Sequence, residues 1–269
     1  MNNYTRLSHL KQGMGRTTAV SDVMLLRAIE AASRFFDRES SRPMFSTIAT
    51  RYVAATYAGE AILDLNQDLL SITTLKYDSA AAATFTATLV VNTDYWLPDS
   101  GAPIRSLELN PLSSILTSWP SIRRRIQIVG AWGYSNATEP AGTLGAAITT
   151  TTATAVTMSA GHTVEAGDTI VIGSEQMDVS AVLVNTLTVA RGINGSTAAT
   201  ALINAAVANR RYPADVEEAI QLDAARTIHE LQTGASGQLA NGEFGGSSFS
   251  ASYPKIRDVI QHYRILVVA

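Results

Sequence analysis

The spacing of apolar residues changes along the chain, and these changes restrict the fold to a mixture of helical and β segments. Leu25, Ile29 and Phe36 recur at helical spacing, Ser21 is a suitable N-cap, and Pro43 stops the pattern. These features predict a helix over about 21–38. Between about residues 50 and 132 the apolar residues alternate with a period of two, which is typical of strands. We therefore expect an antiparallel β region there.

Helical spacing returns near residue 214. Ile220, Ile228 and Leu231 lie on one face of a predicted helix over 214–232, with Pro213 tolerated at its start. The chain as a whole is therefore predicted to be α+β. N- and C-terminal helices pack with a central antiparallel β region, and a small β module and a flexible C-terminal arm complete the chain.

The β module is predicted from a change in composition. Residues 141–208 are rich in Thr, Ala, Val and Gly and contain no Trp, Tyr or Phe. Short apolar runs over 155–158, 169–172, 176–179 and 186–190 are separated by turn dipeptides, which favours a separate domain of short strands. The predicted division is a core of 1–140 and 209–232, an inserted module of 141–208, and an arm with a docking segment over 233–269.

The C-terminal arm begins with a Gly/Ser-rich stretch over 233–252, which buries too little apolar surface to offset the entropy of ordering it. An amphipathic segment and an apolar end follow. Two alternatives remain open: the segment folds back on its own domain, or it docks on a partner. The residues for a docking interface are Tyr253, Ile256, Val259, Ile260, Tyr263, Arg264, Ile265, Leu266, Val267 and Val268.

Composition limits the functional classes. The chain has 269 residues, 46% of them hydrophobic, and a net charge of −3, which disfavours tight binding to nucleic-acid phosphates. It contains no cysteine, so disulfides, thiolate metal sites and a cysteine nucleophile are excluded. We find no apolar run long enough for a membrane span and no secretory signal, and we expect synthesis in a cytoplasm-like space with no membrane partner.

The sequence contains no recognisable pattern of catalytic, nucleotide-binding or metal-binding residues. None of Lys11, Lys76 and Lys255 follows a glycine as a P-loop requires, and the four histidines are not at the spacing of a helical zinc site. We therefore predict no catalytic residues, no cofactor and no metal site. Surface solvation is the preferred interpretation of carboxylate pairs such as Asp64 and Asp68.

The run Arg123-Arg124-Arg125 has two interpretations. Consecutive arginines can neutralise phosphates, but strand alternation would place Ile122, Arg124 and Ile126 on one face and Arg123 and Arg125 on the other. A solvated strand end or an ion pair between subunits is favoured over a nucleic-acid site.

An ordered series of segments resembles a known family. The segments are SDVMLLRAIEAASRFFDRESSRPMF, AGEAILDLNQDLLSITTLKYD, IQIVGAWGY, YPADVEEAIQLDAARTIHEL and SYPKIRDVIQHYR. They resemble the head-to-tail connector, or adaptor, proteins of tailed bacteriophages. In the family pattern Trp132-Gly133-Tyr134 leads within a few residues to Pro213-Ala214-Asp215, whereas this chain has an insertion of nearly seventy residues between them.

The resemblance implies a structural virion protein at the head-tail junction. It would form a homo-oligomeric ring, expected to be a dodecamer, between the portal protein and a neck, stopper or tail completion protein. DNA would pass through its lumen without specific binding. We place portal docking on the C-terminal residues given above, and subunit contacts on Leu25, Ile29, Phe36, Ile220, Ile228 and Leu231. The alternative is a β-rich tail or baseplate module that recognises a surface ligand through 141–208, although the absence of aromatic residues there disfavours carbohydrate.

Overall fold

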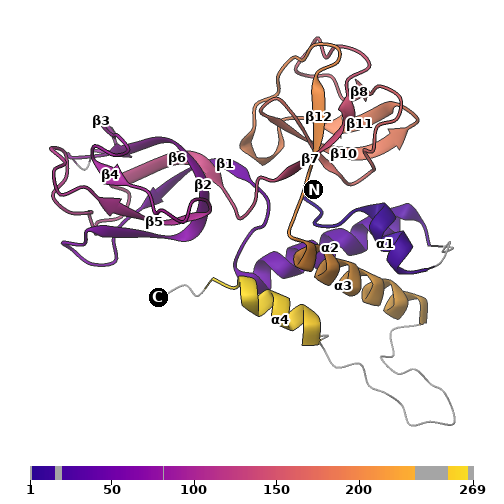
Figure 1. The fold of residues 1–269 in the computed structure, drawn as a ribbon, viewed down its shortest axis with the longest axis horizontal. Coiled ribbons are helices and arrows are strands. Elements are labelled where there is room, and N and C mark those ends of the chain that lie inside the picture. Colours follow the sequence, from indigo (N-terminus) through magenta and orange to yellow (C-terminus); the bar gives the residue numbers. More distant parts are fainter. Residues whose placement is uncertain (1, 16–19, 81, 234–253, 266–269) are drawn as a thin grey trace, which may run out of the picture. The chain divides into compact units, whose positions relative to one another are not determined.

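The computed structural model describes residues 2–15, 20–80, 82–233 and 254–265. These residues form two compact units. The first contains residues 1–41 and 137–264, and the second contains mainly residues 42–136. Helices lie at both ends of the chain and antiparallel sheets lie between them, which confirms the predicted α+β class (Figure 1).

The first unit contains a layer of helices, whose bounds are α1 Leu7–Gly13, α2 Asp22–Ser40, α3 Ala214–Thr233 and α4 Pro254–Tyr263. Helix α2 begins after Ser21, whose backbone is extended, and ends at Ser41 in the left-handed region. Its buried stripe includes Leu25, Ile29 and Phe36, so the helical periodicity of the sequence reports the buried face correctly. The helix α1 was not expected from the sequence.

The first unit also contains a six-stranded antiparallel sheet with the order β7-β12-β9-β10-β11-β8. Its strands are β7 Thr138–Thr143, β8 Ala155–Thr157, β9 Thr169–Ile172, β10 Glu175–Leu183, β11 Thr186–Ala190 and β12 Ala206–Arg210, and a short 3-10 turn, η1, spans Ile193–Gly195. All the buried residues of its hydrophobic cluster fall between Ala141 and Val207. The sheet therefore has a core of its own.

The second unit is a six-stranded antiparallel sheet with the order β1-β6-β2-β5-β4, and β3 pairs with β2. Its strands are β1 Thr47–Val53, β2 Ile62–Tyr77, β3 Ala87–Leu89, β4 Tyr95–Trp96, β5 Ile104–Leu109 and β6 Ile126–Trp132. The long strand β2 pairs with β5 up to Leu69 and with β6 from Leu69 onward. It has a register shift between Asp64 and Leu69, with Asn66 at φ 52°.

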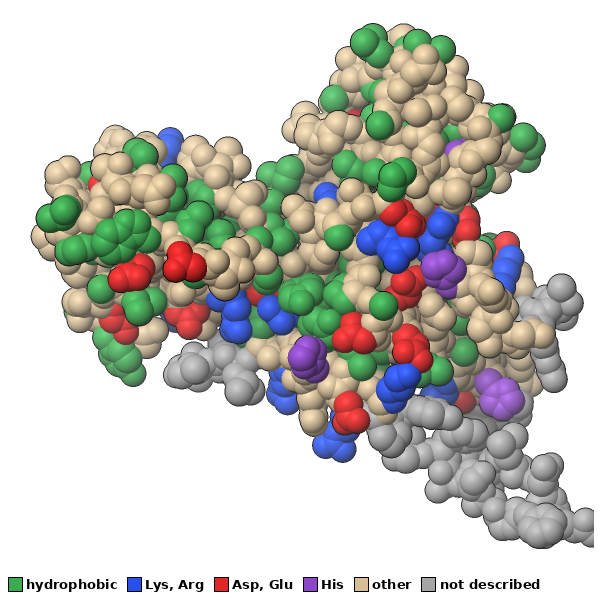
Figure 2. Space-filling view, viewed as in Figure 1, with side chains coloured by type: hydrophobic (Ala, Val, Ile, Leu, Met, Phe, Trp, Pro, Cys, Tyr) green, Lys and Arg blue, Asp and Glu red, His purple; other side chains and the backbone are tan. Residues whose placement is uncertain are grey.

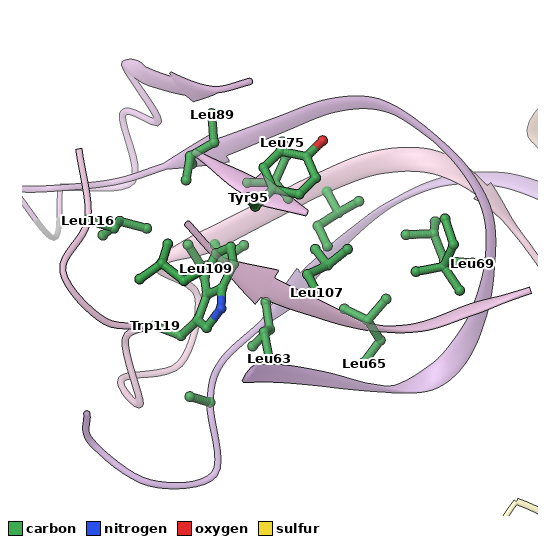
Figure 3. Packing of buried hydrophobic residues seen from close by; sticks show 14 of the residues in the cluster. Leu63, Leu65, Leu69, Leu75, Leu89, Tyr95, Leu107, Leu109, Leu116 and Trp119 are labelled. Carbon is green, nitrogen blue, oxygen red and sulfur yellow. The ribbon is translucent and has the colours of Figure 1, made fainter. Parts of the chain in front are cut away.

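This bend lets one strand contribute to both sides of a core. Figure 3 shows β2 curving past Leu69 so that the leucines of its first part and of β5 face the interior. Trp119 and Trp132 are both buried in this cluster. Their indole nitrogens donate to the backbone carbonyls of Ala61 and Ala49 at 2.9 and 3.1 Å. The polar atoms of the two largest buried side chains are thus satisfied.

The expected alternation at Arg123-Arg124-Arg125 is wrong. Strand β6 begins only at Ile126, and Arg124 has φ 64°, so the preceding residues form a turn. A left-handed residue interrupts the alternation of side chains on which the prediction depended.

The boundaries of the two compact units differ from the predicted division of the chain into 1–140 with 209–232, 141–208 and 233–269. That division stays a prediction.

Candidate functional site

Helices α2, α3 and α4 contact one another, and this three-helix layer brings together most of the residues that the sequence singles out. The candidate subunit-contact residues Leu25, Ile29, Phe36, Ile220 and Ile228 are all buried within the chain. Leu231 differs, because 61% of its surface is exposed. The apolar stripes therefore pack the helices of one chain together, and subunit contacts at these residues stay a prediction.

The last helix lies on its own subunit. Ile256, Ile260 and Tyr263 of α4 are buried, and Ile265 just beyond the helix is buried too. Val259 is half-buried and Arg264 is exposed. Since α4 contacts α2 and α3, the structure supports the fold-back alternative for this helix.

Polar contacts fix the orientation of α4. The Tyr263 hydroxyl donates to Asp215 Oδ1 at 2.9 Å. The ring of Tyr263 lies 6.1 Å from that of Phe36, measured between centroids. Lys255 Nζ lies 2.5 Å from Glu218 Oε1 at the exposed side. Carboxylates near the start of α3 thus contact both ends of α4, and negative groups near a helix N-terminus also suit the helix dipole.

Four of the docking residues cannot be placed. Tyr253, Leu266, Val267 and Val268 lie outside the described residues, as does most of the predicted flexible arm. A portal contact at the C-terminal end therefore stays a prediction.

The N-terminal segment is a second feature of this unit, and no pattern in the sequence predicted its role. Tyr4 is buried, and its hydroxyl donates to Asp37 Oδ1 at 2.5 Å. Its backbone N–H donates to Ser33 Oγ at 3.1 Å, and its ring lies 4.5 Å from the ring of Tyr212. Burial, and then the negative charge of Asp37, raise the pKa of Tyr4 well above its usual value. Tyr4 therefore serves as a neutral hydrogen-bond donor that attaches the segment to α2.

The same segment contacts the β7–β12 sheet. Arg6 Nη2 lies 3.1 Å from Asp168 Oδ2 and also donates to the carbonyl of Thr163. Asn2 and Asn194 exchange side-chain hydrogen bonds of 2.9 and 2.8 Å. Burial raises the pKa of Asp168 to about 6, although the charge of Arg6 opposes the shift. Residues 2–6 thus join the helices to the sheet within this unit.

The arginine run lies in the second unit, and its members have different roles. Arg125 donates to the carbonyls of Asp78 and Ser79, the latter at 2.7 Å, and to the Tyr77 hydroxyl at 3.1 Å. Arg124 is exposed, with its guanidinium 5.1 Å from the centroid of the Tyr52 ring. Arg123 is also exposed. Arg125 therefore closes a turn, whereas the other two face solvent.

The described residues show no group that suggests catalysis. Among them, no three or more His, Asp or Glu side chains lie together so that they could hold a metal ion. Within the same residues, no helix combines the length and apolar character that crossing a membrane requires. The expectation that the chain is not an enzyme stays a prediction.

The chain was compared with known families, curated proteins and solved structures. No protein-family model matches the chain, and no curated protein matches it. A solved structure described as "Neck of empty GTA particle computed with C6 symmetry" contains a chain similar to this one. The likeness covers 99% of this chain and 92% of that chain, at 12% identity and a TM-score of 0.44. Such a level of likeness assigns neither a family nor a function, and we infer neither from it.

Proposed function

We propose that this chain is a structural protein of a phage-like virion that forms the adaptor ring between the portal and the neck or tail. The observation that carries the proposal is the convergence of three separate segments of the connector resemblance. They contain α2, α3 and α4, which lie far apart in the sequence and contact one another in one helical layer. An ordered series of weak motifs is more informative when its members build one substructure.

The chemistry of the chain agrees with a structural role in contact with moving DNA. A net charge of −3 gives no general attraction to phosphates. The ring stoichiometry, the portal contact and the contact with a stopper or tail completion protein all belong to this proposal.

A portal-binding measurement tests the proposal. Purified full-length chain is mixed with assembled portal of the same particle and examined by size-exclusion chromatography and electron microscopy. The proposal expects a ring bound at one end of the portal, with one copy of this chain per portal subunit. A chain that stays unbound at micromolar concentration, or that is found away from the head-tail junction in whole particles, contradicts it.

A surface-binding role for the β7–β12 sheet is the second candidate. Leu183 and Val184 at the β10–β11 turn and Leu202 in a later turn are each at least 77% exposed. Exposed aliphatic turns can contact a protein surface, whereas sugar binding usually uses aromatic rings. If isolated particles still bind host cells after residues 141–208 are removed from this chain, the surface-binding role is excluded.

A further inference from the structure

The two outer faces of the second unit differ in charge. On one side, Tyr52 of β1, Gln127 of β6 and Lys76 of β2 lie opposite one another in the strand register. Directly opposed residues share a face of a sheet. Their neighbours Leu75, Ile126 and Ile128 are buried, so this row points outward. Arg124 stacks on Tyr52 at the end of the row. We name Tyr52, Lys76, Gln127 and Arg124 the positive face.

A second row lies on the other part of the sheet. Glu108 of β5 is opposite Ile62 of β2 and also opposite Trp96 of β4. The adjacent pair Leu63 and Leu107 is buried, so this row also points outward. Ile62 is 56% exposed and Trp96 is 36% exposed. We name Ile62, Trp96 and Glu108 the negative face.

The two faces lie on opposite sides of one core. Leu75, Ile126 and Ile128 behind the positive face and Leu63 and Leu107 behind the negative face belong to the same hydrophobic cluster. The two rows lie on the outside of this cluster, and they approach each other at one edge, where Asp64 of β2 lines a depression of about 580 Å³ together with Tyr52 and Arg124. In Figure 2, acidic side chains gather over the region where Figure 1 labels β5.

Unpaired charges dominate each face. Among the described residues, neither Arg124 nor Glu108 takes part in an ion pair, and both side chains are exposed. Two acids border the positive face. Asp78 is buried and accepts hydrogen bonds from the backbone N–H groups of Ala80 and Ala83. Asp64, which is opposite Ser106 in the β2–β5 ladder and adds negative charge beside Ile62, also lines a depression with Tyr52 and Arg124. The basic residue on β5, Arg105, is exposed and partly offsets Glu108.

The positive face is also hollowed. A depression of about 510 Å³ is lined by residues that include Tyr52, Phe85, Ile122 and Arg124. The rings of Tyr52 and Phe85 lie 5.5 Å apart. Trp, Tyr and Arg are the residues most enriched at the centres of protein interfaces. An apolar side chain such as Trp96 has the character to enter this depression.

We propose that the positive face of one subunit docks on the negative face of a second copy of this chain. Such a contact joins two different surfaces, so it repeats from copy to copy and produces a closed ring when the rotation between copies permits closure. The inference rests on the proposed ring and adds the surface that holds it together. Charge complementarity selects a second copy, because both signs are present on one unit. A polyanion such as DNA would match only one of the two faces.

Cross-linking tests the proposed pairing, and the absence of cysteine from the chain provides a clean background. Thr88→Cys marks the positive face, because Thr88 lies opposite Lys76. Leu97→Cys lies at the edge of the negative face, because Leu97 is adjacent to Trp96 in the chain, just beyond β4, and is 39% exposed. The two full-length variants are mixed, with or without portal as a template, and treated with a short bismaleimide. We expect cross-links between the two variants and few within either one. Leu183→Cys, on the first unit, is the control.

Charge reversal gives the second arm of the test. Arg124→Glu and Glu108→Arg are each expected to weaken self-association at low salt at least about tenfold. A mixture of the two variants should recover it, because the reversed charges again face each other. Arg105→Glu, which strengthens the negative face, is the matched control and should not weaken association. Recovery cannot arise from misfolded variants.

The outcomes separate the two claims. A ring on the portal without cross-links between Thr88→Cys and Leu97→Cys overturns the proposed pairing and leaves the proposed function standing. Cross-links within one variant indicate a symmetric contact and also overturn it. Retention of duplex DNA that is lost in Arg124→Glu while self-association is unchanged overturns it in favour of a nucleic-acid site. Cross-links between the two variants in a protein that does not bind portal support the pairing and contradict the proposed function.

Discussion

Asp168 is the residue whose surroundings give the clearest dependence on pH. Its pKa is raised to about 6, chiefly by burial, whereas an unfolded aspartate titrates near pH 4. The folded chain therefore binds the proton more tightly than the unfolded chain between these values. Stability is highest below pH 4 for this group and falls as the pH rises to 6, by roughly 2–3 kcal/mol.

The substitution Asp168→Asn tests this sign. The variant has no titrating group there, so its free energy of unfolding relative to wild type should rise as the pH is raised from 4 to 6. Urea unfolding at several pH values measures the difference. Asp64→Asn, which changes an exposed carboxylate, is the control and should follow the wild-type curve. A difference between Asp168→Asn and wild type that does not vary with pH contradicts the assignment.

Ile256 tests the packing of α4. Ile256→Ala removes a buried side chain from a helix that contacts α2 and α3, and it should lower the free energy of unfolding of the isolated chain by about 2–4 kcal/mol. Gln261→Ala on the exposed side of α4 is the control and should change it by less than about 0.5 kcal/mol. If α4 leaves the helices to bind a partner, Ile256→Ala will have no effect on the chain alone.

At the residue scale, the sequence predicts which residues are buried better than it predicts which residues they contact. The period of apolar residues in α2 and α3 identifies Leu25, Ile29 and Ile228 as buried. It does not say whether another helix of the same chain or a second subunit covers them. The roles of Arg6 and Tyr4 could not be predicted, because their partners Asp168 and Asp37 are set by tertiary contacts and not by a local pattern.

At the element scale, periodic segments were predicted, and the edge strand β7 was missed. Helix α2 and strands β8, β9 and β11 lie within two residues of the predicted bounds. Strand β7, with the sequence TEPAGT, contains Pro and Gly and has no apolar alternation. It forms because β12 pairs with it, at the junction where the insertion begins and ends.

That pairing makes removal of the insertion a practical test. Glu139 and Asn209, which remain when residues 141–208 are removed, are direct partners in the β7–β12 ladder, so a short Gly/Ser linker can replace residues 141–208. The buried residues of the removed sheet form their own cluster. We therefore expect the remaining chain to unfold cooperatively in thermal denaturation, at a somewhat lower temperature because Arg6 loses Asp168. A gradual transition without a cooperative midpoint contradicts an independent module.

A truncation at the C-terminus separates stability from portal binding. Truncation after Thr233 would remove α4 and expose the helices that it covers. Truncation after Ile265 retains α4 and the buried Ile265. The proposed portal contact predicts that the second truncation keeps the wild-type melting temperature and loses binding to portal. Full binding by this truncated chain would withdraw the portal contact from the last residues.

At the scale of the whole molecule, we propose that this chain forms the ring that joins portal and neck. The helical layer explains how the three separated segments of the resemblance form one substructure. In the proposed ring, the positive face of one copy contacts the negative face of the next.

Cryo-electron microscopy of the head-tail junction in whole particles tests this claim most directly. We expect a closed ring of this chain in contact with the portal, with as many copies as the portal has subunits. Tyr52 and Arg124 of each copy should face Trp96 and Glu108 of the next. A map that places the chain outside the neck, or that contains fewer copies than the portal has subunits, would contradict the claim.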